Sequence, residues 1–145
     1  MRRAAVLVAA IAGLAGCGGP PRLHADGAWV RLPAVPGRPA AAYLTLHGGE
    51  QPAVLAGVAS DAAVRAEMHE SMAGAGMTTM RPLAQVEVPP ESDIAFAPGG
   101  RHVMLFDVDP RVKPGSILPL RLRYAGGEEE RVLAQVVGAG DAPPR

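Results

Sequence analysis

The residues Ile117-Leu118-Pro119-Leu120-Arg121-Leu122-Arg123-Tyr124 decide the fold class, because apolar and polar side chains alternate along them. From residue 118 to residue 124, the even-numbered positions carry leucine or tyrosine and the odd-numbered positions carry proline or arginine. Successive side chains of a β-strand point to opposite faces, so this alternation is typical of a strand with one buried and one solvated face. We therefore predict a half-buried strand over residues 116–124.

The same alternation recurs along the chain between clear turn signals. Segments rich in Pro and Gly, such as Pro98-Gly99-Gly100 and Gly126-Gly127, separate the apolar runs, and no long stretch has a helical period. The expected strands cover residues 25–32, 41–47, 53–59, 63–70, 78–87, 93–97, 102–108, 116–124 and 130–137. Short strands at such regular spacing favour an all-β fold, an antiparallel sandwich or barrel.

The N-terminus has the features of a bacterial lipoprotein signal. Two arginines precede an apolar run over residues 4–15, which is too short for a comfortable membrane span. Leu14-Ala15-Gly16-Cys17 resembles the lipobox, in which the cysteine is lipidated and becomes the first residue of the mature protein. We assign residues 1–16 to a lipoprotein signal peptide and residues 17–25 to the lipidated Cys17 and a flexible tether. An ordinary signal peptide with an incidental cysteine is the alternative.

Length and charge limit what the mature protein does. Removal of the signal leaves 129 of the 145 residues, enough for one domain with a real core. We assign that domain to residues 26–137 and expect residues 138–145 to be disordered. Two of the 14 basic residues fall in the signal, which leaves 12 against 14 acidic residues, and Lys113 is the only lysine. With this balance, electrostatic attraction does not favour binding to nucleic acid, and the charges do not form a polybasic patch for membrane binding.

Two histidines and two methionines form a spaced set, His69-x10-Met80-x21-His102-x-Met104. His102 and Met104 are two residues apart on one expected strand, so they share a face. His69 ends another expected strand, and Met80 enters the next one. We expect the four side chains to meet at one end of the barrel and to surround one ion with two imidazole nitrogens and two thioether sulfurs.

The donor types predict the metal. Thioethers are soft ligands that select Cu(I), whereas zinc is usually bound by Cys, His or carboxylate and Cu(II) prefers nitrogen and oxygen donors. A blue-copper centre needs a thiolate, and the only cysteine, Cys17, lies in the tether. One Cu(I) per chain is therefore the best fit. His24 and His47 have no partner in this pattern and are expected to be structural or surface residues.

The connection over residues 71–77 is expected to be a flexible loop, because it contains Gly74 and Gly76. Met72 and Met77 lie in it. We expect them either to capture copper transiently, and so to replace the methionine ligand in part, or merely to cover the site.

At this point the chain resembles the periplasmic copper chaperone family called PCu(A)C, whose signature is the same His-x10-Met-x21-His-x-Met spacing. The resemblance covers roughly residues 26–137. Stretches similar to the family are Ala28-Trp29-Val30-Arg31, Ala42-Tyr43-Leu44, Glu67-Met68-His69-Glu70, Met80-Arg81-Pro82 and residues 98–105. The resemblance implies a cupredoxin-like Greek-key β-barrel that binds one Cu(I) through His69, Met80, His102 and Met104.

The resemblance also implies a role at the periplasmic face of the cell envelope. Members of the family help to metallate the CuA centre of cytochrome c oxidase, often beside a Sco-type thiol protein. Two features depart from the family. Many members are soluble in the periplasm, whereas this chain is expected to be lipid-anchored through Cys17. Some members carry a His/Met-rich C-terminal extension, whereas residues 138–145 contain neither residue.

The sequence therefore predicts a non-enzymatic Cu(I) chaperone, whether it delivers, stores or detoxifies copper. One alternative is a zinc-dependent envelope hydrolase that uses His69, His102 and Glu67 or Glu70, although its site would leave both methionines unused. Another alternative is a metal-free adhesive or binding lipoprotein with a β-sandwich fold. The metal content of protein purified from the envelope distinguishes the three.

Overall fold

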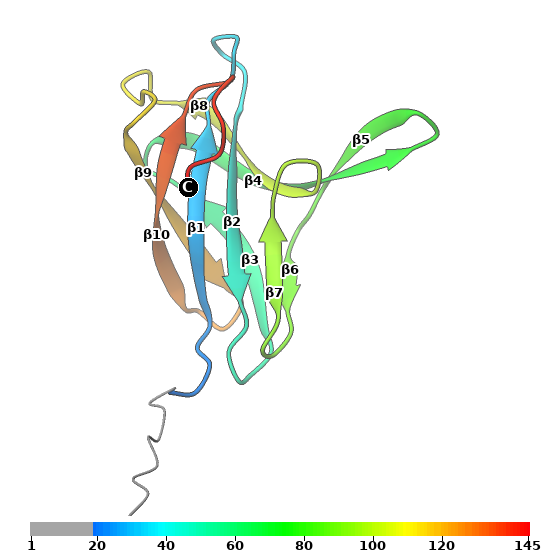
Figure 1. Ribbon diagram of the computed structural model, residues 1–145. Coiled ribbons are helices and arrows are strands. Elements are labelled where there is room, and N and C mark those ends of the chain that lie inside the picture. Colours follow the sequence, from blue (N-terminus) through cyan, green and yellow to red (C-terminus); the bar gives the residue numbers. More distant parts are fainter. Residues whose placement is uncertain (1–18) are drawn as a thin grey trace, which may run out of the picture.

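The computed structural model describes residues 19–145, and this part of the chain consists of β-strands and connections without any helix (Figure 1). The predicted signal peptide, residues 1–16, and Cys17 lie outside the described residues. The ten strands are β1 (His24–Arg31), β2 (Ala40–His47), β3 (Ala53–Ala59), β4 (Ala63–Gly74), β5 (Met77–Pro82), β6 (Val86–Val88), β7 (Asp93–Phe96), β8 (Arg101–Val108), β9 (Ile117–Tyr124) and β10 (Glu129–Val137). No helix in the described part is long and apolar enough to cross a membrane.

The strands form one sheet that curls into an open barrel. Its order is β5-β4-β8-β7-β2-β1-β10-β9-β3-β6, with a further pairing of β8 to β2. Most neighbours are antiparallel, whereas β1 pairs with β10, and β7 with β8, in parallel. The curl brings β3 into contact with β4. The predicted all-β, cupredoxin-like class is confirmed.

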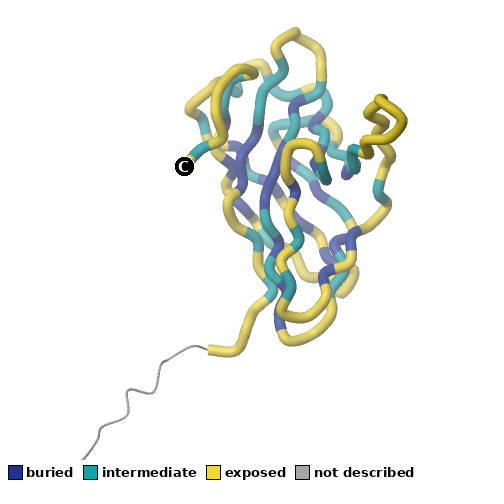
Figure 2. The backbone as a smooth tube through the Cα atoms, turned by 45° about the vertical axis from the view of Figure 1, so that its right-hand side comes forward, coloured by how far each residue is buried: buried dark blue, intermediate teal, exposed yellow. Residues whose placement is uncertain are grey.

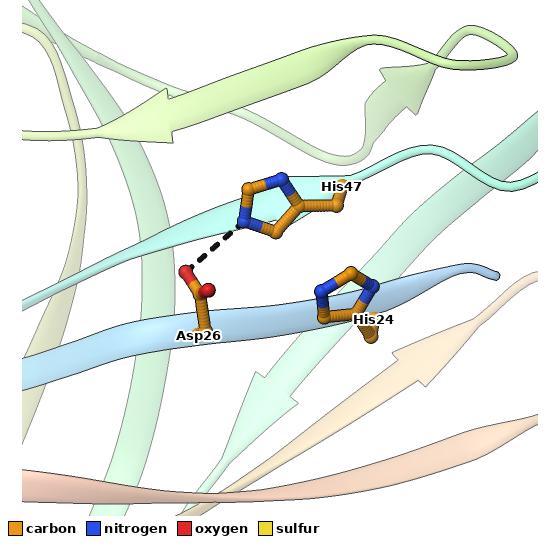
Figure 3. Close-up of side chains that lie close together, drawn as sticks. All are labelled: His24, Asp26 and His47. Carbon is orange, nitrogen blue, oxygen red and sulfur yellow. Dashed lines mark hydrogen bonds and ion pairs between the residues drawn. The ribbon is translucent and has the colours of Figure 1, made fainter. Parts of the chain in front are cut away.

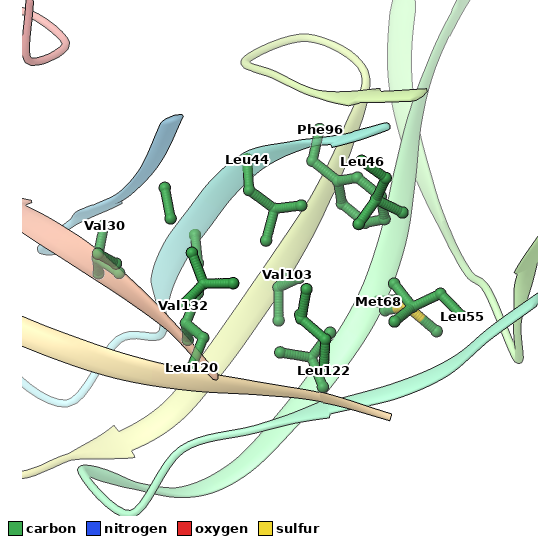
Figure 4. Packing of buried hydrophobic residues seen from close by; sticks show 14 of the residues in the cluster. Val30, Leu44, Leu46, Leu55, Met68, Phe96, Val103, Leu120, Leu122 and Val132 are labelled. Atoms are coloured by element: carbon green, nitrogen blue, oxygen red, sulfur yellow. The ribbon is translucent and has the colours of Figure 1, made fainter. Parts of the chain in front are cut away.

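The core fills the inside of the curled sheet (Figures 2 and 4). Leu118, Leu120 and Leu122 are fully buried, as the alternation along β9 predicted. Met68 of β4 and Val103 of β8 point into the same core and are opposite each other in the β4–β8 register. Because the strand period is two, their neighbours in sequence lie on the outer face.

Two segments differ from the expected strands, and both flank the candidate site. The strand expected over residues 63–70 continues to Gly74, and the one expected over 78–87 divides into β5 and β6. Residues 71–77 are therefore not a loop: β4 and β5 form a hairpin closed by Ala75 and Gly76. Both turn residues have positive φ, 49° and 75°, which is the backbone that a two-residue hairpin turn requires.

The ends of the domain are tied to the sheet. β1 begins at His24, inside the segment assigned to the tether. After β10 the chain makes a turn in which the Gly138 N–H donates to Oδ2 of Asp141 at 2.7 Å, and Arg31 donates to the Asp141 carbonyl at 3.1 Å. The disorder of residues 138–145 as a whole stays a prediction.

The β4–β5 hairpin projects from the body of the domain, with an exposed tip (Figures 1 and 2). A charged cluster lies at its base. Glu70 of β4 accepts two hydrogen bonds from Arg81 of β5, at 2.7 and 3.1 Å, and Arg101 of β8 lies 3.7 Å from its other oxygen. The Arg81 hydrogen bonds, more than the Arg101 charge, hold the pKa of Glu70 below its usual value. The cluster joins three neighbouring strands across one face.

We predict that Glu70→Gln loosens the hairpin and leaves the barrel intact, because the amide loses the charge attraction to both arginines while the core stays unchanged. Hydrogen exchange should speed up for the backbone amides of residues 71–81 and stay the same in β9. Asp61→Gln, which removes an exposed carboxylate paired with Arg121 elsewhere, is the control. Unchanged exchange in the hairpin would show that the cluster does not restrain it.

Candidate metal centre

The pairing of β4 with β8 brings three of the four predicted ligands together. The register sets His69 opposite His102, and Glu67 opposite Met104. Residues two apart on a strand share a face, so the side chains of these two opposed pairs all lie on the outer face of the two-stranded ribbon formed by β4 and β8. His102 is 6% exposed and the His69 side chain 14%, although neither points into the main core.

The hydrogen bonds of the two imidazoles leave one ring nitrogen of each without a protein partner. Nε2 of His69 donates to Oε2 of Glu67 at 3.0 Å, and its Nδ1 is buried without a hydrogen-bond partner in the described structure. Nδ1 of His102 donates to the Gly100 carbonyl at 3.0 Å, so its Nε2 keeps the lone pair. The ring centres lie 6.0 Å apart. With metal–nitrogen bonds of about 2 Å, this separation of the rings is compatible with one ion bound by a nitrogen of each ring.

Glu67 is the residue at this site whose role sequence reasoning missed, because it was considered only as part of a zinc site. Arg65 lies 3.1 Å from Oε1 of Glu67, and His69 binds Oε2. The Arg65 guanidinium also lies over the Phe106 ring, 4.1 Å from its centre. The Glu67 carboxylate is thus fixed from one side and orients the His69 ring from the other. The Glu67-x-His69 spacing on a strand is the signal for this pairing.

An aromatic pair continues the outer face beyond Met104. Met104 is opposite Ala41 of β2, and Tyr43 follows two residues later on the same face. Tyr43 packs against Trp29 with ring centres 4.4 Å apart, and burial raises the pKa of Tyr43. Both residues are largely buried, so this pair forms an apolar patch on the outer face beside the β4–β8 pair.

Met80 lies on the same face but apart from the other three predicted ligands. The hairpin register sets it opposite Ser71, which shares the outer face of β4 with His69. Met80 and His69 are thus diagonal neighbours, with an expected Cα separation of about 7–8 Å. The Met80 side chain is 58% exposed. Met80 therefore reaches an ion at the histidine pair only if the hairpin or the side chain turns inward.

The hairpin register contradicts the expectation that Met72 and Met77 replace Met80. Met72 is opposite Thr79, and Met77 is opposite Gly74. On β4, Met72 alternates with Ser71, and on β5, Met77 has the opposite parity to Met80. Both side chains therefore leave the hairpin on the face away from His69. The expectation failed because it treated residues 71–77 as a loop, in which side-chain directions are free.

Sequence reasoning also missed a second cluster of polar side chains, which lies at the start of β1. His47 donates from Nδ1 to Asp93 at 2.7 Å and from Nε2 to Asp26 at 3.0 Å. These two hydrogen bonds, with Asp26 contributing most, raise the pKa of His47. His24 stacks on the His47 ring. Both histidines lie at the surface, as expected, but their pairing was not predicted, because they are 23 residues apart in the sequence.

Comparison with known proteins gives one family. The family model described as "Putative lipoprotein LpqE-like" matches residues 23–136. A curated relative, the putative lipoprotein Lxx21020 of Leifsonia xyli subsp. xyli (strain CTCB07), is 30% identical over 147 residues, covering 92% of this chain and 88% of that protein.

Solved structures with the same fold include PCuAC domains. The copper-bound PCuAC domain from PmoF2 superimposes with a TM-score of 0.67 at 23% identity, covering 83% of this chain and 97% of that one. The Cu(I) form of DR1885 from Deinococcus radiodurans superimposes with a TM-score of 0.58 at 25% identity, covering 85% and 81%. These matches confirm the resemblance to the PCu(A)C family that the sequence indicated.

Proposed function

The chain belongs to the LpqE-like lipoprotein family, and we propose that it is an extracytoplasmic Cu(I) carrier and not an enzyme. The observation that carries the proposal is the pair formed by His69 and His102. These side chains face each other across two strands, and the buried Nδ1 of His69 lacks a partner in the described structure. A buried polar atom without a hydrogen bond is costly, and a metal ion would satisfy it.

The methionines decide between metals. Met104 lies beside the histidine pair and Met80 lies on the same face, so soft thioethers are at hand as further donors. The Glu67 carboxylate is equally near, but it is already paired with Arg65 and with Nε2 of His69. Thioethers favour Cu(I) over zinc and Cu(II). We infer one Cu(I) per chain, bound by His69, His102, Met104 and Met80. The Cu(I) form of the similar protein DR1885 supports the choice of Cu(I) as the metal.

The position of Met80 suggests how the ion would be exchanged. Three of the proposed ligands lie where β4 pairs with β8, whereas Met80 lies on β5, in the exposed hairpin. A recipient that approaches the exposed side can displace Met80 first, while the other three still hold the ion. This stepwise release suits a chaperone, which needs binding that is tight but reversible.

We further propose that the recipient is the CuA-bearing subunit of cytochrome c oxidase, a Sco-type copper protein, or both. We also propose that a lipid on Cys17 anchors the chain at the periplasmic face of the bacterial envelope. The family resemblance supports the recipients, and the lipoprotein descriptions of the family and the relative support the anchor. Protein purified from the envelope should contain Cu(I). Zinc would instead favour the hydrolase, and no metal the adhesive module.

Met80→Ala should weaken Cu(I) binding, and Met77→Ala should not. The two residues lie on the same exposed strand, but only Met80 shares a face with His69. We expect Met80→Ala to lower the affinity by more than about tenfold, a loss of about 1.4 kcal/mol. Competition titration with a chromophoric Cu(I) chelator measures both variants, and circular dichroism checks their folding. A larger loss for Met77→Ala would exclude the proposed ligand set.

Glu67→Gln should weaken Cu(I) binding although the residue is not a proposed ligand. The carboxylate holds the His69 ring so that Nδ1 is free, and loss of such a partner typically lowers metal affinity about 10–100-fold. Glu87→Gln, on the separate strand β6, is the control in the same titration. Equal affinities for the two variants would mean that Glu67 does not position the ring.

Cys17→Ser should release the protein from the membrane fraction and prevent processing between residues 16 and 17. No helix in the described residues is able to span a membrane, so an anchor on Cys17 would be the main attachment. Fractionation of cells and mass spectrometry of the N-terminus measure the two effects. Normal processing and continued membrane attachment of the variant would contradict lipidation at this residue.

A further inference from the structure

The second cluster presents nitrogen and oxygen donors without any sulfur. β1 and β2 set His24 directly opposite His47, and their ring centres lie 4.6 Å apart (Figure 3). Asp26, two residues after His24, accepts a hydrogen bond from Nε2 of His47. One donor atom from each of the three residues lies within 4.8 Å of the other two.

His24 and Asp26 share a face by simple alternation, and a β-bulge follows directly after them on β1. Asp26 pairs with Thr45 and Trp29 pairs with Tyr43, so β1 has one residue more than β2 over this stretch. Gly27 takes the extra residue's left-handed backbone, with φ of 60°. Simple alternation would put Asp26 and Trp29 on opposite faces. Because of the bulge they share the outer face, together with the side chains that they oppose on β2.

Both histidines have Nδ1 bound to an oxygen acceptor. Nδ1 of His24 lies 2.8 Å from the Arg22 carbonyl, and Nδ1 of His47 lies 2.7 Å from Oδ1 of Asp93. Metal-binding histidines usually donate their other ring N–H to a carboxylate or a backbone carbonyl. Nε2 of His24 is thus left for an ion, and Nε2 of His47 becomes available to the same ion when the ion replaces the proton that His47 donates to Asp26.

We propose that His24, Asp26 and His47 bind one divalent transition-metal ion, and that Cu(II) binds there more tightly than Zn(II). Two imidazoles and a carboxylate suit both ions, and affinity at such sites rises to a maximum at Cu(II). Metal bonds of about 2 Å require donors within about 4 Å of one another. The exposed side chains of His24 and Asp26 can turn to close the remaining gap.

This site is separate from the proposed Cu(I) site in residues and in chemistry. It shares no ligand with His69, His102 and the methionines, and it offers no soft donor. The inference therefore stands without the proposed function. The chain would then have one site for Cu(II) and a separate site for Cu(I).

The test is Cu(II) titration of the full chain in air, followed by electron paramagnetic resonance. We expect one Cu(II) per chain with a tetragonal signal and coupling to two nitrogens. Replacing His24 or His47 by Ala should lower the affinity by more than about tenfold and change the nitrogen coupling. Asp93→Asn should lower the affinity about 10–100-fold and keep both nitrogens, because Asp93 only orients His47.

Two controls make the test decisive. Asp61→Asn removes an exposed carboxylate outside the cluster and should leave Cu(II) binding unchanged. The double variant His69→Ala/His102→Ala should also keep the Cu(II) signal, even though it is designed to lose Cu(I). Zn(II) should displace Cu(II) only in large excess. Loss of the signal in the double variant, or full Cu(II) affinity in His24→Ala, would overturn the proposal.

Discussion

The antiparallel pairing of β4 with β8 determines which side chains meet on the outer face of the sheet at the candidate metal site. Met68 and Val103 anchor the register from the inside, because both are buried in the core and oppose each other. A slip of β4 by one residue would turn Met68 out to solvent and His69 into the core, and a slip of β8 would do the same to Val103 and His102. The free energy of core burial thus also sets the two imidazoles opposite each other. Packing inside the hydrophobic core therefore determines the geometry of a polar site on the opposite face of the same strands.

The hairpin of β4 and β5 adds a part of different character. β4 pairs with β8 from Ala63 to Glu70 and with β5 from His69 to Gly74, so beyond Glu70 its main support is β5. The Glu70 cluster holds the base of this extension, and the tip is exposed (Figure 2). A fixed pair of imidazoles beside an adjustable thioether is a reasonable arrangement for an ion that must be both bound and released.

Alternation in the sequence was enough to predict the all-β class and most strands. Leu118 to Tyr124 show why: every second side chain is buried, and the turns on either side carry Pro or Gly. The hairpin was not predicted, because Gly74 and Gly76 read equally well as a flexible loop or as a two-residue turn. Only the register distinguishes these, and it sets Met72 and Met77 on the face away from His69.

The second cluster was also beyond sequence reasoning, for a related reason. His24 and His47 come together through strand pairing, which links positions far apart in the chain. Asp26 joins His24 on that face by simple alternation, and the bulge at Gly27 then brings Trp29 to the same face. The spacing of His69, Met80, His102 and Met104 was a stronger signal, because the chain also resembles a family with the same pattern.

The measurement that most directly tests the account is nuclear magnetic resonance of the methionine methyl groups during addition of one equivalent of Cu(I). Thioether coordination shifts the signal of the bound methyl group. The account predicts that the signals of Met80 and Met104 shift and reach saturation together at one equivalent, while those of Met68, Met72 and Met77 stay in place. A shift of Met72 or Met77 in place of Met80 would contradict the faces assigned by the hairpin register, and with them the proposed copper site.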